Sequence, residues 1–232
     1  MYKRKRVTAV VLAAGSGSRM GGPLNKVRLP LDERSVIEYA LRAFAEHPYV
    51  DDLVLVVRQD EREEMEPLTR GQGKPCRLVI GGATRQASVY HAILDVTSEI
   101  VLVHDGARPL VGAAIISGCV EAMDRYDGAI PALPAEERVC SLGKGRRARP
   151  VLFEQQPLYR AQTPQCFATK ILRLCHERHK DGPGLTDDSH LLELEGYKVG
   201  VLPGDPANVK ITTPLDLLVV KAYLEKEPEG HR

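Results

Sequence analysis

The stretch V-T-A-V-V-L-A-A-G-S-G-S-R-M-G-G-P-L-N-K, at residues 7–26, decides how the chain is interpreted. Its continuous apolar run predicts a strand at 7–13 that is buried on both faces. The run ends in a loop of small residues, where backbone N–H groups can approach a phosphate closely. Arg19 and Lys26 supply the positive charge that a triphosphate requires. The stretch therefore predicts a phosphate site at the end of a buried strand, with a glycine turn that binds no ligand as the alternative.

The spacing of the glycines excludes two other phosphate-binding loops. The Walker motif needs Gly-Lys-Ser/Thr, whereas Gly22 is followed by Pro23. The dinucleotide fingerprint needs G-x-G-x-x-G, whereas Gly15, Gly17 and Gly21 leave three residues in the second gap. We therefore expect neither a P-loop nucleoside triphosphatase nor a nicotinamide-dependent dehydrogenase.

Strand and helix patterns alternate along the chain that follows. Apolar runs rich in Val, Ile and Leu lie at 53–57, 77–80 and 100–104, and segments with helical spacing lie at 35–46, 84–95 and 113–126. This alternation predicts an α/β, Rossmann-like fold with a mostly parallel central sheet and helices on both faces. In such folds ligands bind beyond the carboxyl ends of the strands.

The pattern changes after residue 128. An apolar strand at 129–133 leads into a polar, Gly- and Arg-rich excursion at 134–158, which lacks a core pattern of its own and predicts a projecting β-arm. Helices are predicted at 169–180, 187–194 and 214–224, and Pro214 at a first helical position supports the last of them. We expect one domain at 1–232 with an arm at about 134–158.

Composition limits the functional classes. The formal net charge of +1 gives no global reason to expect a nucleic-acid partner, so an anionic substrate requires a local cluster of positive charge. The apolar run at 7–14 is too short for a signal or membrane segment. The five cysteines show neither zinc nor redox spacing. We therefore expect a cytoplasmic protein without a membrane partner.

Six motifs carry a resemblance to a known family. The first loop resembles that of the sugar nucleotidyltransferases, which reads approximately L-A-A-G-x-G-x-R-M-G and is followed by a lysine. Five further motifs, in the right order, resemble the methylerythritol phosphate cytidylyltransferases: G-G-A-T-R-Q-A-S-V at 81–89, V-H-D-G-A-R-P at 103–109, Q-T-P-Q at 162–165, T-D-D at 186–188 and N-V-K-I-T-T-P at 208–214.

The resemblance implies a nucleotidyltransferase fold and transfer of CMP from CTP to 2-C-methyl-D-erythritol 4-phosphate, with Mg²⁺ as the cofactor. It also assigns the site residues by role. The implied nucleotide-binding residues are Ala13, Ala14, Gly15, Gly17, Gly82, Arg85 and Ser88; the implied catalytic residues are Arg19, Lys26 and Lys210; and the implied acceptor-binding residues are Asp105, Arg108 and Thr186.

Asp105 follows the predicted strand at 100–104, where a carboxylate can bind magnesium or orient the acceptor. The alternative is a local ion pair with Arg108. His104 is expected to pack or to form hydrogen bonds, because an acceptor phosphate is already ionised at pH 7 and needs no general base. Cys175, His176 and His179 are predicted to lie on a solvated helix face rather than to bind a metal.

The match weakens on the acceptor side. Glu137 and Arg138 stand where the family usually has an Asp-Thr pair, and Gln155 stands where it usually has an arginine that reaches the neighbouring subunit. The resemblance also implies a homodimer that interlocks through the arm at 134–158, with a disordered loop as the alternative. Use of CTP is thus better supported than the acceptor, and two alternatives stay open: a ribitol 5-phosphate cytidylyltransferase and a CTP-binding homologue without catalysis.

Overall fold

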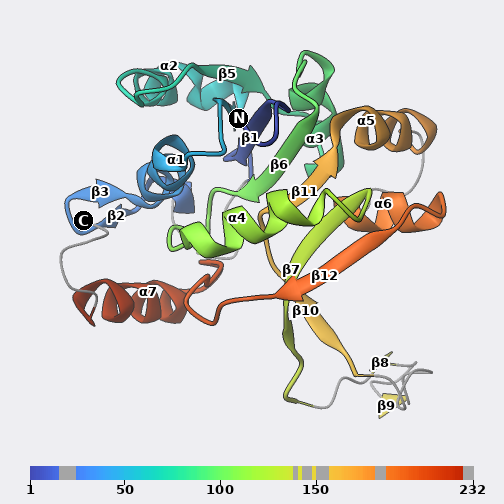
Figure 1. Cartoon of the computed structure of the whole chain (residues 1–232). Coiled ribbons are helices and arrows are strands. Elements are labelled where there is room, and N and C mark those ends of the chain that lie inside the picture. Colours follow the sequence, from blue (N-terminus) through green and yellow to red (C-terminus); the bar gives the residue numbers. More distant parts are fainter. Residues whose placement is uncertain (16–24, 138–140, 143–147, 150–156, 181–186, 227–232) are drawn as a thin grey trace.

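The computed structural model describes residues 1–15, 25–137, 141–142, 148–149, 157–180 and 187–226. Its central sheet has the strand order β10-β7-β11-β6-β1-β4-β5, and β12 also pairs with β7 (Figure 1). Pairing is parallel among β6, β1, β4 and β5 and between β12 and β7, whereas β11 and β10 run antiparallel to their neighbours. The strands are β1 Val7–Leu12, β4 Asp52–Val57, β5 Cys76–Ile80, β6 Ile100–Asp105, β7 Gly128–Pro134, β10 Tyr159–Ala161, β11 Gln165–Ala168 and β12 Val199–Pro203. The predicted α/β, mostly parallel fold is confirmed.

Helices cover both faces of the sheet (Figure 1). Side chains alternate along each buried strand, so Leu53 and Leu55 pack with one cluster and Val54 with the other. The first cluster includes residues of α1 (Val36–Glu46) and α4 (Ala113–Ala122), and the second includes residues of α3 (Arg85–Leu94), α5 (Thr169–Arg178) and α6 (Asp188–Leu194). Burial on both faces explains why these strands appear as nearly continuous apolar runs.

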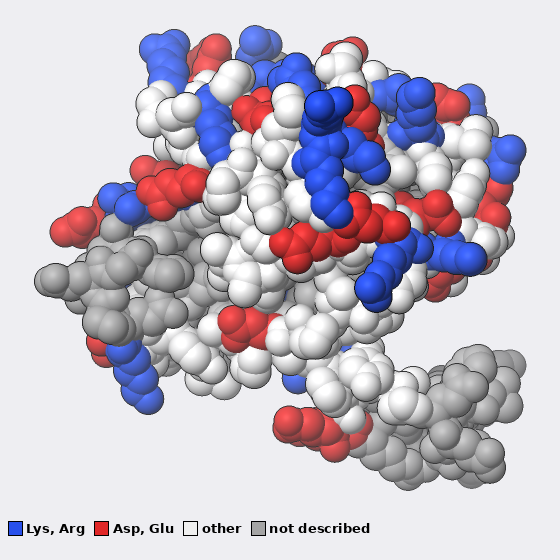
Figure 2. Space-filling model, viewed as in Figure 1, with Lys and Arg blue, Asp and Glu red and all other residues white. Residues whose placement is uncertain are grey.

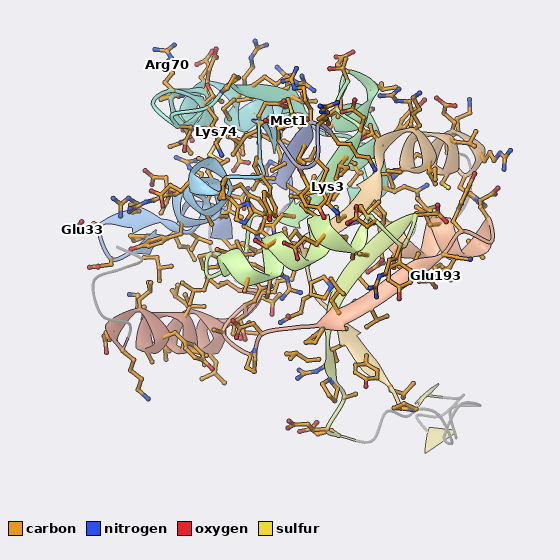
Figure 3. All side chains as sticks on the ribbon, in the orientation of Figure 1. Met1, Lys3, Glu33, Arg70, Lys74 and Glu193 are labelled. Atoms are coloured by element: carbon orange, nitrogen blue, oxygen red, sulfur yellow. The ribbon has the colours of Figure 1, made fainter. Side chains whose placement is uncertain are left out.

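A smaller layer flanks α1. The hairpin of β2 (Pro30–Leu31) and β3 (Arg34–Ser35) and the helix α7 (Pro214–Lys226) share a third apolar cluster with it. The segment after β4 forms the short helices η3 (Gln59–Glu61), α2 (Arg62–Met65) and η4 (Glu66–Thr69). Lys74 follows them (Figure 3). Its Nζ donates a hydrogen bond to the carbonyl of His47 at the end of α1.

The parallel strands end at the same edge of the sheet. Leu12 is in register with both Val56 and Asp105, and Val57 is in register with Ile80. The loops after β1, β4, β5 and β6 therefore meet at this edge, where an α/β sheet binds its ligands.

Three strands in the second half of the chain, β10, β11 and β12, were not predicted from the sequence. β11 inserts between β6 and β7, antiparallel to both, and thereby carries the segment at 162–165 to the ligand-binding edge. Beyond β7 and β10, β8 (Ser141–Leu142) pairs with β9 (Ala148–Arg149), at the lower right of Figure 1. Most of the predicted arm, including Arg138 and Gln155, lies outside the described residues.

The prediction of a solvated face for Cys175 and His176 is wrong. Both side chains are buried. Cys175 belongs to the second core cluster, and His176 Nε2 lies 3.0 Å from Asp188 Oδ1. His179, by contrast, is half-buried and pairs with Glu195. The described part of the chain contains no group of three or more His, Cys, Asp or Glu side chains arranged to hold a metal.

Surface charge is mixed. Figure 2 shows basic and acidic side chains side by side on the face viewed, without a field of one sign. Among the described helices, none has the length and apolar character to span a membrane.

Candidate active site

A cavity of about 580 Å³ opens where the loops after β1, β4, β5 and β6 meet. This volume lies within the range of small-molecule sites. Among the described residues that line it, one side chain is anionic, Asp105, and four are cationic: Lys26, Arg58, Arg85 and Lys210. The excess of positive charge is local, as the near-neutral composition requires for an anionic ligand.

Asn25 holds the end of the first loop in place. Its Nδ2 donates to the carbonyl of Ala13 at 2.9 Å and to Glu61 Oε2 at 2.9 Å, and it is the N-cap of η2 (Lys26–Arg28). Ala13 is buried, and its N–H donates to Val56 O at 2.7 Å. The backbone of Ala13 therefore ties the start of the loop to β4, and Asn25 fixes the end of the loop, from which Lys26 reaches the cavity.

Small residues line the other wall. Ala14, Gly15 and Gly82 all border the cavity. A Cβ added to Gly82 would lie 2.5 Å from Ala87 Cβ, so the close approach of this loop to α3 depends on glycine. Ser88 Oγ accepts from the N–H of Gly82 at 3.1 Å and lies 2.9 Å from the carbonyl of Thr84. Ser88 thus fixes the loop, leaving a slot lined by backbone and methyl groups.

Asp105, the last residue of β6, is the centre of the charge cluster. Its Oδ2 lies 2.8 Å from Lys210 Nζ and 3.7 Å from Arg108 Nε, and its Oδ1 lies 3.6 Å from Arg85 Nε. Burial alone would raise the pKa of Asp105, but Arg85, Lys210 and Arg108 outweigh burial and hold it well below its usual range. The carboxylate is therefore ionised at any pH at which the protein operates.

Arg85 bridges the cavity and the interior. Its Nη1 lies 2.5 Å from Asp188 Oδ2, and Asp188 in turn pairs with His176. Burial opposes the charge of Arg85, yet Asp188 and Asp105 raise its pKa above the usual value. In the sequence Asp188 stood out only as part of the T-D-D motif at 186–188. In the structure the N-cap of α6 is Asp187, and Asp188 is a buried counter-ion.

Arg108 is buried below the cavity rather than lining it. Its Nη1 donates to the carbonyl of Asn208 at 2.7 Å, and its Nε has no hydrogen-bond partner among the described residues. Burial lowers the pKa of Arg108, partly opposed by Asp105. Arg108 therefore contacts Asp105 and the backbone of Asn208, and its role in acceptor binding stays a prediction.

Three predicted site residues cannot be placed. Gly17, Arg19 and Thr186 lie outside the described residues, so their roles stay predictions. Of the others, eight line one cavity from four segments of the chain: Ala14, Gly15, Lys26, Gly82, Arg85, Ser88, Asp105 and Lys210. Ala13 and Arg108 are buried beside it and do not line it.

The comparison with known families adds the decisive observation. A family model described as "IspD: 2-C-methyl-D-erythritol 4-phosphate cytidylyltransferase" matches residues 7–226. The chain belongs to this family. A relative from Bacillus thuringiensis with the name of the family is 38% identical over 94% of this chain and 97% of its own length. A relative of the same name from Clostridium beijerinckii is 37% identical over 94% of this chain and 98% of its own.

Solved structures of this family share the fold. The crystal structure of 4-diphosphocytidyl-2C-methyl-D-erythritol synthase from Anaerococcus prevotii is similar with a TM-score of 0.83 at 29% identity, covering 96% of this chain and 99% of that one. The 2-C-methyl-D-erythritol 4-phosphate cytidylyltransferase from Thermus thermophilus is similar with a TM-score of 0.77 at 29% identity, covering 95% and 99%. The family resemblance and the enzyme class predicted from the motifs are confirmed.

Proposed function

We propose that this member of the IspD family transfers CMP from CTP to 2-C-methyl-D-erythritol 4-phosphate, releasing pyrophosphate. The observation that carries the proposal is the cavity itself. It combines a slot of small residues with four cationic side chains, of which Arg85 and Lys210 pair with the ionised carboxylate of Asp105. Such a site suits a nucleoside triphosphate beside a second phosphorylated substrate.

The nucleotide side uses the walls of the slot. We assign the base and ribose to the loops that contain Ala14, Gly15 and Gly82, where backbone groups are exposed to the cavity. The triphosphate is assigned to Lys26 and Lys210, with Arg19 as the third predicted cation. Arg58, which the sequence did not single out, also lines the cavity at the end of β4, where its guanidinium pairs with Asp60.

The reaction we propose is a direct displacement. A phosphate oxygen of the acceptor attacks the α-phosphorus of CTP, the bond to the bridging oxygen breaks, and pyrophosphate leaves with the electron pair. Negative charge increases around the phosphorus during this step, and positioned cations stabilise it. Asp105 holds Lys210 and Arg85 in position and can accept hydrogen bonds from acceptor hydroxyls.

Magnesium was expected at Asp105, and the described geometry does not fit a resident ion there. Oδ2 accepts a hydrogen bond from Lys210 Nζ at 2.8 Å, and two guanidinium groups lie within 4 Å of the same carboxylate. A divalent cation bound to Asp105 would face three positive side chains. We therefore derive no step through a protein-bound metal; phosphate oxygens of the nucleotide are the ligands that Mg²⁺ would find in this site.

A homodimer through the arm at 134–158 and a cytoplasmic location belong to the same proposal. Tyr159 at the base of the arm is 54% exposed, which leaves an aromatic side chain available to a partner subunit. The four cysteines among the described residues, Cys76, Cys119, Cys166 and Cys175, are free thiols, which suits a reducing compartment.

The test compares acceptors. Pyrophosphate release is measured with CTP and 2-C-methyl-D-erythritol 4-phosphate, beside ribitol 5-phosphate and beside a Lys26→Ala variant. We expect turnover with the first acceptor that is lost in the variant. Turnover with ribitol 5-phosphate alone would identify ribitol 5-phosphate as the acceptor in place of 2-C-methyl-D-erythritol 4-phosphate. CTP binding without pyrophosphate release with either acceptor would favour the non-catalytic homologue.

A further inference from the structure

The turn at 105–108 is fixed through its backbone as well as through its side chains. The N–H of Asp105 donates to Thr163 Oγ1 at 3.0 Å, and the N–H of Gly106 donates to the carbonyl of Leu12 at 2.9 Å. The carbonyl of Ala107 accepts from the N–H of Ile211 at 2.9 Å. These backbone hydrogen bonds fix the position from which the Asp105 side chain reaches the cavity.

The last backbone group of the turn is held by His104. Its Nε2 lies 3.0 Å from the carbonyl of Arg108, and its Nδ1 lies 3.1 Å from Thr163 Oγ1. His104 is completely buried, with Phe44 edge-on against the ring at 4.9 Å between centroids. Thr163 is 5% exposed, so bulk water does not compete for these hydrogen bonds.

The contacts determine the direction of each hydrogen bond. A carbonyl only accepts, so His104 Nε2 carries a proton and donates it to Arg108 O. Burial lowers the pKa of His104 to about 4, which leaves Nδ1 of the neutral ring as an acceptor. The hydroxyl of Thr163 therefore donates to Nδ1 while it accepts from the N–H of Asp105. These hydrogen bonds form a relay from the Asp105 N–H through Thr163 and His104 to Arg108 O, and each donor in it has one acceptor.

We propose that Thr163 and His104 are positioning residues that lock both ends of the turn carrying Asp105 and Arg108, and so set the affinity for the acceptor phosphate. The proposal rests on the assignment of Asp105 and Arg108 to the acceptor. It gives a role to the Q-T-P-Q motif at 162–165, which the proposed chemistry does not use. Neither residue lines the cavity, so both act through the turn.

The test uses a matched pair at one position. Thr163→Val keeps the side-chain shape but removes the hydroxyl, leaving the Asp105 N–H and His104 Nδ1 unpaired; Thr163→Ser restores the hydroxyl. Loss of such a buried partner predicts a rise of about tenfold or more in the KM for 2-C-methyl-D-erythritol 4-phosphate. The KM for CTP should stay within about twofold, and Thr163→Ser should behave as the wild type.

Thr169→Val is the control for loss of a buried threonine hydroxyl. Thr169 is 2% exposed and its Oγ1 has no hydrogen-bond partner within the described part of the chain. It lies at the opposite end of β11 from the site. This variant should retain both KM values.

A second measurement does not depend on turnover. In the wild type, ¹⁵N NMR should show His104 as the neutral ring protonated at Nε2, and amide exchange should show a protected Asp105 N–H. Thr163→Val should accelerate exchange at Asp105, and Thr163→Ser should not. If the wild type failed to use the acceptor, the proposed function would be wrong. The exchange of the Asp105 amide would still test whether Thr163 and His104 hold the turn. Unchanged exchange at Asp105, or equal increases in both KM values, would overturn the inference.

Discussion

Replacement of Asp188 by Asn removes a buried charge with little change in shape. Asp188 is 1% exposed, and its two oxygens face Arg85 and His176. Removing one partner of a fully buried ion pair costs about 3–5 kcal/mol. Arg85 is 23% exposed and stays near Asp105, and the amide oxygen still accepts from a neighbour, so solvent and the remaining contacts offset part of that cost. We expect Asp188→Asn to lower the free energy of unfolding by roughly 2 kcal/mol at pH 7.

The difference in unfolding free energy between wild type and Asp188→Asn should depend on pH. Burial raises the pKa of Asp188, but Arg85 and His176 outweigh burial and the net shift is downward. A depressed pKa contributes stability that is present above the unfolded value, about 4, and is lost as the pH falls through the folded value. The difference between wild type and variant should therefore be full at pH 7 and narrow below about pH 4.

Urea unfolding of both proteins between pH 7 and pH 3.5 measures this difference. Glu46→Gln is the control, because it removes a carboxylate that is 62% exposed and pairs with Arg42 on α1, and it should leave the midpoint nearly unchanged. Equal stability of wild type and Asp188→Asn at pH 7, or a difference that grows as the pH falls, would refute the assignment of Asp188 as the counter-ion of Arg85.

Other substitutions separate charge, shape and support at the site. Lys210→Ala should lower kcat by about 10²–10³-fold, measured as pyrophosphate release at saturating substrates, because a positioned cation is lost where charge develops; an unchanged kcat would remove Lys210 from the mechanism. Gly82→Ala should weaken CTP binding in calorimetry, since its Cβ would meet Ala87 Cβ at 2.5 Å. Gly118→Ala in α4 has 3.9 Å of clearance and should instead raise stability by about 0.5–1 kcal/mol in thermal unfolding. Asn25→Ala should raise the KM for CTP more than the KM for the acceptor, because η2 loses its cap; equal increases would count against its local role.

The sheet was predictable because its strands follow a simple rule. β1, β4, β5 and β6 are buried or half-buried and appear in the sequence as runs of Val, Ile and Leu between helical patterns. The later strands do not. β11 has four residues, and β12 contains a glycine and a proline and exposes Val201, so neither shows a continuous apolar run.

The loops of the site could be predicted from the sequence, whereas the buried hydrogen bonds and ion pairs that hold these loops in place could not. Small residues and cations at strand ends indicated a phosphate site before any contact was known. Asn25, Thr163 and Asp188 act through partners 12, 58 and 103 residues away, respectively. A single sequence shows the polar residue but not the buried group that it satisfies, so supports of this kind require the three-dimensional structure.

The most direct measurement is ³¹P NMR of the products formed from CTP and 2-C-methyl-D-erythritol 4-phosphate with magnesium present. We predict equal amounts of pyrophosphate and a cytidine diphosphate ester, with loss of the acceptor monophosphate signal. Intact CTP and acceptor, or CTP hydrolysed to CDP and inorganic phosphate, would contradict the transfer of CMP at this site.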